Sequence, residues 1–199
     1  RSPPVVSKKL FVAGIVLGRV KKIDNNKYSV LGLPADCVNY AINSKIGKKK
    51  FDLVVSGINN GANMGDDINY SGTVGAAREG FLHGVNSIAL SIVNKKNPKY
   101  SECTLTFKSI LSRILKKKIK SFFFNINYPN LPTNAIKGIR FTKQGSRAYG
   151  QKIISKRDPR GNEYFWIGGK DLSYKAKKGT DVDAVRHGYI SITPLIVDY

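Results

Sequence analysis

The sequence of 199 residues predicts an α/β fold, in which a mostly parallel, Rossmann-like sheet is flanked by helices and followed by a smaller β-rich portion. Up to Tyr128, apolar β-branched segments alternate with helix-like segments, which is typical of strand–helix–strand units. A turn-rich link at residues 130–134 then leads, from Lys137 onward, into strand-like segments broken by Gly and Pro, with no strong helix. We therefore expect residues 1–128 to form the α/β core and residues 129–199 the β-rich portion.

The first predicted elements follow from apolar segments and from helix-start signals. Residues 10–20 are apolar and β-branched and predict one or two strands, and residues 28–31 predict another short strand. Pro34 and Asp36 indicate the start of a helix, because Pro suits the first helical turn and Asp complements the helix dipole. The strand expected over residues 51–56 has the apolar character of a buried strand.

The later elements of the core continue this alternation. A helix of small residues is predicted over about residues 73–83, with Gly84 as the residue that ends it. A buried strand is expected over residues 87–93 and another over residues 121–128. Between them, the apolar spacing of residues 105–115 predicts an amphipathic helix, and the lysine run that follows suits a helix C-terminus.

The formal charge of +21 is extreme and raises the alternative of a protein that binds nucleic acid or another polyanion. Of the 34 basic residues, 25 are Lys and 9 are Arg, whereas proteins that read bases and phosphates tend to rely on Arg. The lysines are scattered, apart from short runs at residues 48–50 and 116–118. We therefore expect mainly a solvated surface and no nucleic-acid partner, with a positive field that helps to gather anionic phosphate substrates.

Composition also bounds the environment of the protein. No stretch approaches the roughly 20 apolar residues of a membrane span, so we expect no membrane partner. The two cysteines, Cys37 and Cys103, lack the spacing of a metal or redox site. Each is most simply a small buried apolar residue in a reducing compartment, and we expect a cytoplasmic protein.

The chemistry of the chain is concentrated in residues 51–80, FDLVVSGINNGANMGDDINYSGTVGAAREG. A strand leads into a loop rich in Gly and Asn, and a small-residue helix begins at Ser71-Gly72-Thr73. Ligands of parallel sheets bind beyond the carboxyl ends of the strands, where this loop is expected. The helix start offers unpaired N–H groups and the positive end of its dipole, so the segment suits an oxyanion.

This segment resembles the signature of the SurE ("survival protein E") family of 5'/3'-nucleotidases, in which a strand precedes SG-[IV]-N-x-G-x-N-x-G-x-D, then SGT-[VA], then a helix ending in EG. The matching residues are Ser56-Gly57-Ile58-Asn59, Gly61, Asn63, Gly65, Asp67, Ser71-Gly72-Thr73-Val74 and Glu79-Gly80. Further motifs keep the family's order at residues 32–38, 158–161, 164–166, 180–181, 184–185 and 188–195. The resemblance covers essentially the whole chain and implies a C-terminal portion with an extended β-hairpin and subunit contacts.

The resemblance also implies one divalent metal ion, Mg²⁺ or Mn²⁺, with Ser2 and Asn59 as two of its ligands. Ser and Asn supply neutral, hard oxygens, which suit these ions better than a thiolate-type zinc site would. Carboxylates must complete the site, and in the family they belong to an N-D-D-G motif that this sequence lacks. We therefore expect a fragment without the family's first βαβ unit and without its C-terminal segment, and we assign no catalytic residue.

For the phosphate group, the resemblance points to five residues: Gly61, Asn63, Ser71, Gly72 and Thr73. Two alternatives stay open, because Asn63 equally suits a role in holding the loop, and Ser and Thr are ordinary N-cap residues. Asp66 and Asp67 are a weaker alternative as a metal pair, since adjacent aspartates on a loop can point to different sides.

Other polar and aromatic residues have simpler explanations. His83 at a helix end, His187 in a turn and Glu79 on a helix surface are expected to be non-catalytic. Tyr164 and Trp166 are expected in the core or at a dimer contact, with base stacking as the alternative.

The function implied by the resemblance is that of a metal-dependent phosphohydrolase, which removes phosphate from nucleoside 5'-monophosphates. Nucleoside 3'-monophosphates and short polyphosphate are further candidate substrates, and a homodimer or homotetramer is implied. Two alternatives remain: a non-catalytic protein that binds polyanions or nucleic acid, and an inactive short form that acts as a partner subunit.

Overall fold

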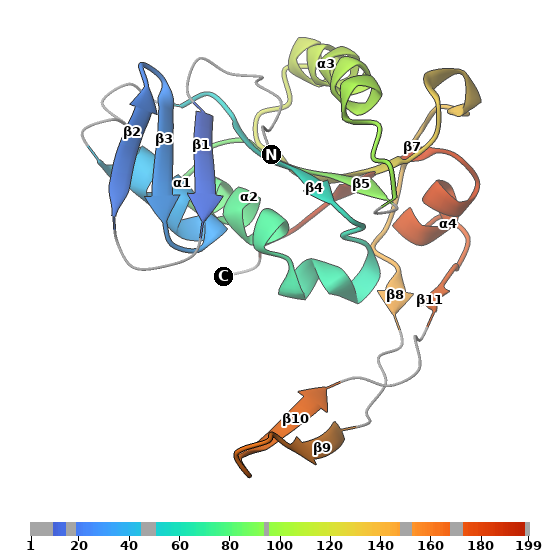
Figure 1. Cartoon of the computed structure of the whole chain (residues 1–199). Coiled ribbons are helices and arrows are strands. Elements are labelled where there is room, and N and C mark those ends of the chain that lie inside the picture. The colour runs from blue at the N-terminus through green and yellow to red at the C-terminus, as the bar shows by residue number, and fades with distance from the viewer. Residues whose placement is uncertain are drawn as a thin grey trace.

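The computed structural model describes residues 10–14, 19–44, 51–93, 96–147, 153–167 and 173–197, and its centre is a five-stranded sheet (Figure 1). The strands, in their order across the sheet, are β4 (Val54–Asn60), β5 (Ser87–Val93), β6 (Phe123–Pro129), β12 (Ile190–Pro194) and β7 (Ile139–Phe141). β4, β5 and β6 are parallel, whereas β12 runs antiparallel to β6 and parallel to β7. The expected mostly parallel α/β sheet is confirmed.

A second, three-stranded sheet precedes the main one along the chain and has the order β1-β3-β2. β1 (Leu10–Gly14) and β3 (Lys27–Leu31) are parallel, and β2 (Val20–Asp24) is antiparallel to β3. β1 and β3 correspond to the strands predicted for this part of the chain, whereas β2 shares only Val20 with the predicted span.

The long helices lie where the sequence predicts them: α1 (Pro34–Asn43), α2 (Gly72–Leu82) and α3 (Tyr100–Lys116). At the start of α1, the Asp36 carboxylate accepts the N–H of Leu33 at 2.7 Å. α2 ends ahead of Gly84, whose φ of +75° is the left-handed conformation expected of a glycine that terminates a helix.

Alternate residues of β5 and β6 divide the core between the two faces of the sheet. One face packs against α3, and its buried cluster includes Ile88, Leu90, Ile92, Phe122, Phe124, Ile126 and Tyr128 with Cys103, Phe107, Ile110 and Ile114 of the helix. On the other face, Ala89 and Phe123 pack against Val74 and Ala77 of α2. The three consecutive phenylalanines are thus shared between both faces, and the sheet is covered on each side.

The C-terminal portion completes the main sheet and also forms a separate hairpin. β7 and β12 belong to the main sheet, so the predicted portions share it, and their division at residue 128 stays a prediction.

The remaining strands and the 3-10 helices are short. They are β8 (Ser146–Arg147), β9 (Ile153–Arg157), β10 (Glu163–Ile167), β11 (Tyr174–Lys175), η2 (Gly65–Tyr70) and η3 (Thr133–Ala135). β9 and β10 form a hairpin, here called the arm, which lies apart from the main sheet (Figure 1). β8 pairs with β11, and we call this pair the arm base.

The expectation of no strong helix after residue 137 is wrong, because α4 (Asp181–Arg186) lies there. Thr180 caps this helix by accepting the N–H of Asp183 at 3.3 Å, and residues 181–185 are buried. Six residues are too few to show helical periodicity, so tertiary burial and the cap determine this helix rather than an amphipathic pattern.

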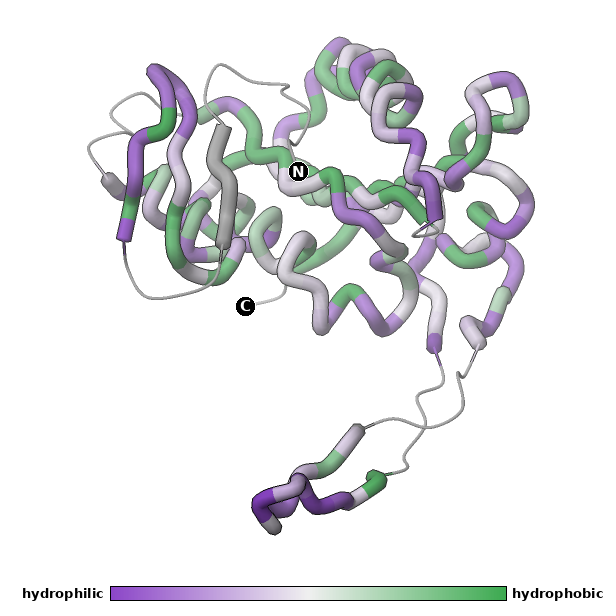
Figure 2. Tube along the Cα trace, in the orientation of Figure 1, coloured by the Kyte–Doolittle hydropathy of each residue, from purple (hydrophilic) through white to green (hydrophobic). Residues whose placement is uncertain are grey.

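Hydropathy follows this architecture. Figure 2 shows hydrophobic residues along the central strands and hydrophilic residues at the tip of the arm. Tyr164 and Trp166 lie on the arm and are 41% and 65% exposed, so the expectation of a place in the core is wrong, and a dimer contact stays a prediction. Within the described ranges, no helix is both long enough and apolar enough to cross a membrane.

The packing of α2 on the sheet predicts opposite effects for two glycines of this helix. A Cβ at Gly80 would lie 2.6 Å from Cγ2 of Val54 and 2.8 Å from Oγ of Ser87, whereas a Cβ at Gly75 would meet nothing within 4 Å. Gly80→Ala should therefore lower the free energy of unfolding by about 1–3 kcal/mol through overpacking. Gly75→Ala should raise it by about 0.5–1 kcal/mol through helix propensity. Urea unfolding would measure both, and equal effects of the two substitutions would contradict this packing.

Burial also predicts that Cys103 is chemically inert in the folded protein. Desolvation raises the pKa of its thiol from 9.0 to about 12, so at pH 8 only roughly one molecule in ten thousand carries the thiolate. Because folding raises this pKa, the thiol does not lower the free energy of unfolding below pH 9. That free energy falls as the pH rises from 9 towards 12, where the unfolded chain ionises first. Native protein at pH 8 should react with a thiol reagent at Cys103 only after denaturant is added. Rapid stoichiometric labelling of Cys103 without denaturant would contradict its burial.

Candidate active site

The signature loop leaves β4 through a distortion that requires glycine. The register between β4 and β5 shifts between Ser56 and Asn59. Within this shift, Gly57 has a φ of +137°, and a Cβ there would lie 2.3 Å from the carbonyl oxygen of Leu90. The close approach of the two strands therefore excludes any side chain at Gly57, and the irregular backbone sets the direction of the Asn59 side chain.

Asn59 supports the turn that follows and keeps one acceptor atom. Its Nδ2 donates to the carbonyl oxygen of Gly61 at 2.9 Å, and the N–H of Gly61 donates to the carbonyl oxygen of Ile92 at 3.0 Å. Among the described residues, Oδ1 of Asn59 accepts no hydrogen bond, so it is the atom that could bind a cation. The N–H of Gly61 is already used, and a phosphate contact at Gly61 stays a prediction.

A network of buried amide side chains holds the middle of the loop. Asn63 is 6% exposed, and its carbonyl oxygen accepts from Nδ2 of Asn125 at 2.8 Å and from Nδ2 of Asn127 at 2.9 Å. The Asn63 N–H donates to Oδ1 of Asn127 at 3.0 Å, and its own Nδ2 donates to Oγ of Ser91 at 2.7 Å. These contacts favour the role of holding the loop for Asn63, and direct phosphate contact remains a prediction.

The network depends on a change from apolar to polar side chains along the face of the sheet that packs against α2. Near the start of β5 and β6 this face carries Ala89 and Phe123, but two residues further on it carries Ser91 and Asn125. All of these residues are buried, so the polar groups must be paired to be tolerated. Asn63 supplies a partner to each of them: its side-chain Nδ2 donates to Oγ of Ser91, and its backbone carbonyl oxygen accepts from Nδ2 of Asn125, whereas Oδ1 of Asn125 has no partner among the described residues. The polar ends of the strands thereby select where the loop lies.

The start of α2 has the open donors expected of an oxyanion site. Ser71 Oγ accepts the N–H of Val74 at 3.1 Å, which confirms the N-cap alternative for this residue. In the part of the chain that the structure describes, the N–H groups of Gly72 and Thr73 have no acceptor. A Cβ at Gly72 would lie 3.1 Å from Cγ of Pro34, so glycine lets the start of α2 lie against the start of α1. Capping and anion binding are compatible, because they use different N–H groups.

Asp66 and Asp67 do not form a free carboxylate pair. Oδ2 of Asp66 accepts the backbone N–H of Arg147 at 2.7 Å. Oδ2 of Asp67 accepts from Nη1 of Arg147 at 2.6 Å and from the hydroxyl of Tyr174 at 2.5 Å. Both carboxylates are therefore engaged with the arm base, which disfavours their use as a substitute metal pair.

Of the two predicted metal ligands, the described residues contain only Asn59, whose oxygen suits a hard divalent cation. Oδ1 of Asn59 is a neutral oxygen of the type that Mg²⁺ and Mn²⁺ accept. No group of three or more His, Cys, Asp or Glu residues that could hold a metal occurs within the described ranges. Ser2 lies outside these ranges. Any complete metal site on this chain therefore needs ligands besides those that the described residues bring together.

The remaining candidates lie in structural contacts. His83 contacts Nδ2 of Asn43 at 3.0 Å, and Glu79 accepts from Nδ2 of Asn39 at 2.8 Å, so both residues join α2 to α1. His187 lies 3.1 Å from Asp183 beside α4. Glu79 thus bridges two helices rather than lying on a free surface, and the structure gives neither histidine a place in the signature loop.

Asp181 is a structural anchor of the loop, a role that the sequence analysis does not assign although residues 180–181 are among its family motifs. It is fully buried, and it accepts the N–H groups of Gly65 at 2.9 Å, Gly145 at 2.8 Å and Val182 at 2.8 Å. Burial raises the pKa of this carboxyl, and the three N–H donors act in the opposite direction. The sequence signal for it is the Thr-Asp pair at residues 180–181, which has the form of a helix start.

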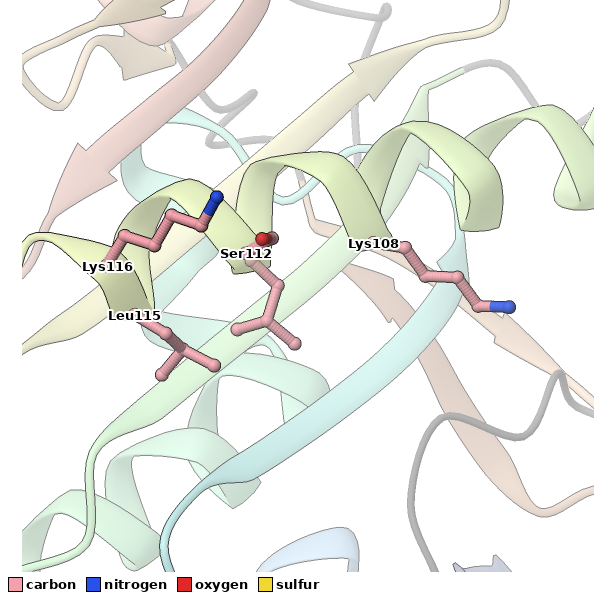
Figure 3. A pocket seen from close by; sticks show the side chains of 5 residues that line it. Lys108, Ser112, Leu115 and Lys116 are labelled. Carbon is pink, nitrogen blue, oxygen red and sulfur yellow. The ribbon is translucent and has the colours of Figure 1, made fainter.

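A hollow elsewhere on the molecule is separate from the loop. It has a volume of about 500 Å³ and is lined by Lys108, Leu111, Ser112, Leu115 and Lys116, all on α3 (Figure 3). Because α3 covers the face of the sheet opposite to α2, this hollow does not include the helix start or the amide network. We therefore place the candidate site at the signature loop and the start of α2, where polar groups converge, and not at this hollow.

These features define the class of the protein: an α/β protein whose candidate oxyanion site lies beyond the carboxyl ends of its parallel strands. The family described as Survival protein SurE matches residues 5–151. The chain therefore belongs to the SurE family.

Relatives and a solved structure agree with this assignment. The chain is 44% identical over 180 residues to a 5'-nucleotidase SurE of Vibrio vulnificus, covering 90% of this chain and 70% of the relative. It is 42% identical over 182 residues to a 5'-nucleotidase SurE of Aquifex aeolicus, covering 90% of this chain and 72% of that protein. The crystal structure of the SurE protein from Aquifex aeolicus superposes with a TM-score of 0.78 at 40% identity, covering 93% of this chain and 77% of the other. The family assignment therefore covers both the sequence and the fold.

The amide network predicts a large cost for removing Asn127. Asn127→Ala would leave the buried N–H of Asn63 without its acceptor, and we expect a loss of about 1–3 kcal/mol in the free energy of unfolding. Asn134→Ala in the exposed turn η3 is the matched control and should change it by less than about 0.5 kcal/mol. Equal urea midpoints for the two variants would show that the network does not hold the loop.

Proposed function

We propose that this protein is a 5'-nucleotidase, which hydrolyses nucleoside 5'-monophosphates to nucleoside and inorganic phosphate. The observation that carries the proposal is the open start of α2, where the Gly72 and Thr73 N–H groups face no acceptor among the described residues. Support also comes from the relatives of Vibrio vulnificus and Aquifex aeolicus, which bear the name 5'-nucleotidase SurE. Phosphate monoesters are the class of oxyanion that such a helix start suits.

In this proposal the substrate phosphate binds at the N-terminus of α2. The N–H groups of Gly72 and Thr73 donate to its oxygens, and the helix dipole stabilises the negative charge that develops during transfer. Ser71 keeps its hydroxyl on the N–H of Val74 and so fixes the direction of the first helical turn. Gly61 and Asn63 contribute by shaping the loop beside the phosphate.

A single divalent ion, Mg²⁺ or Mn²⁺, completes the proposed site, and Asn59 through Oδ1 and Ser2 are its proposed ligands. Such an ion would supply polarisation of a phosphoryl oxygen and activation of water. Asn59 is held for this role by its own Nδ2, which donates to the carbonyl oxygen of Gly61 and leaves Oδ1 without a donor among the described residues. The charge of the ion requires carboxylates in addition to these neutral ligands.

Finer aspects of the proposal concern substrates, assembly and location. We include nucleoside 3'-monophosphates and short polyphosphate as further substrates, since a helix start recognises the phosphate group and not the nucleoside. We also propose a homodimer or homotetramer, because the arm exposes Ile153, Phe165 and Trp166. The two buried, unpaired cysteines are compatible with a cytoplasmic location.

The metal role of Asn59 is tested by comparing it with its exposed neighbour. In the full-length protein, Asn59→Ala should lower Mn²⁺-dependent phosphate release from a nucleoside 5'-monophosphate by on the order of 100-fold or more, because a direct ligand is lost. Asn60→Ala should retain activity within about twofold, since Asn60 lies on the exposed side of β4. Full activity of a folded Asn59→Ala variant would refute the ligand assignment, and an inactive wild-type protein would refute the nucleotidase proposal.

A further inference from the structure

The arm base binds η2, the segment that leads into the proposed phosphate site. Each of its strands contributes one residue, Arg147 from β8 and Tyr174 from β11, and these two residues are paired across the strands. The guanidinium of Arg147 lies over the ring of Tyr174, 4.9 Å from its centre. Both side chains reach the same oxygen of Asp67 in η2. Asp67 therefore contacts both strands of the arm base at once.

A second set of bonds fixes the beginning of η2 to the same part of the molecule. The N–H of Gly65 donates to Asp181, and its carbonyl oxygen accepts from Nε2 of Gln144 at 3.1 Å. The other oxygen of Asp181 accepts the N–H of Gly145, which directly precedes β8. Both backbone polar groups of Gly65 are thus bound by residues that position the arm base.

The end of η2 continues directly into the helix start. The N–H of Ser71 bonds to the carbonyl oxygen of Ile68 at 3.5 Å, and α2 begins at Gly72. Only four positions separate Asp67 from Ser71, so a shift of η2 changes the direction of the Gly72 and Thr73 N–H groups. Since charge-assisted hydrogen bonds weaken steeply with misalignment, phosphate binding depends on where η2 is held.

We propose that Asp67, Arg147 and Tyr174 are positioning residues for phosphate binding. They hold η2 against the arm base, so that the start of α2 points its free N–H groups at the substrate. None of the three needs to touch the substrate, and their effect on the reaction passes through η2. The proposal deepens the proposed nucleotidase function and rests on it.

The test uses variants that remove single contacts from the full-length protein. Tyr174→Phe deletes only the hydroxyl that donates to Asp67, and Tyr164→Phe on the arm is the matched control. For a nucleoside 5'-monophosphate, we expect Tyr174→Phe to raise KM about three- to tenfold and to lower kcat by a smaller factor, because the same N–H groups bind the substrate and face the charge that develops during transfer. Inorganic phosphate should also raise the Tm of this variant less than that of the wild type. Tyr164→Phe should match the wild type in both measurements.

A double variant separates positioning from a general loss of stability. If Tyr174 acts through Asp67, the change in KM for Tyr174→Phe with Asp67→Asn should be smaller than the product of the two single changes. A purely structural hydroxyl would instead lower Tm without raising KM or weakening the phosphate-induced shift in Tm, and this result would overturn the proposal.

A second variant keeps the proposal testable where Tyr174→Phe does not fold. Arg147→Lys retains the charge but loses the guanidinium geometry at Asp67, and it should raise KM in the same way. An unchanged KM in this folded variant overturns the proposal. If the wild-type protein has no activity, the proposed function itself is refuted. If the wild-type protein is active and the variants leave KM unchanged, only the positioning role is refuted.

Discussion

The structure around the candidate site depends on the burial of backbone polar groups in the signature loop. A loop that is buried against the end of a sheet must find hydrogen-bond partners for its N–H and C=O groups, because an unpaired buried polar group destabilises the folded state. Asn125 and Asn127 supply these partners from β6, and both bind the carbonyl oxygen of Asn63. This network fixes the middle of the loop, between Asn59 and the start of α2.

The rest of the site follows from two further constraints at either end of the loop. At the start, Gly57 allows β4 to approach β5 so closely that no side chain fits, and Asn59 emerges from the resulting irregularity. At the end, Asp67 ties η2 to the arm base just before α2 begins. The loop is held at its start, middle and end, while the N–H groups at the helix start stay available. A rigid frame with a few open donors is the arrangement that catalysis by preorganisation requires.

The sequence predicts most of this fold because its local signals agree with one another. Alternating apolar segments, the Pro34 helix start and Gly84 each correspond to the element observed. Asn125 and Asn127 are harder to assign, because two amides in an apolar strand acquire meaning only from Asn63, some sixty residues earlier in the chain. α4 is missed for the same reason, since burial determines it and its six residues carry no periodicity. Long-range polar contacts are thus the part of the site that local patterns could not predict.

The most direct test is a crystal structure of the full-length protein grown with Mn²⁺ and inorganic phosphate, in which anomalous scattering locates the metal. We predict manganese beside Oδ1 of Asn59, and a phosphate oxygen within hydrogen-bond distance of the N–H of Gly72 or Thr73. Manganese at Asp66 and Asp67, or phosphate bound away from the start of α2, would contradict our account of this site.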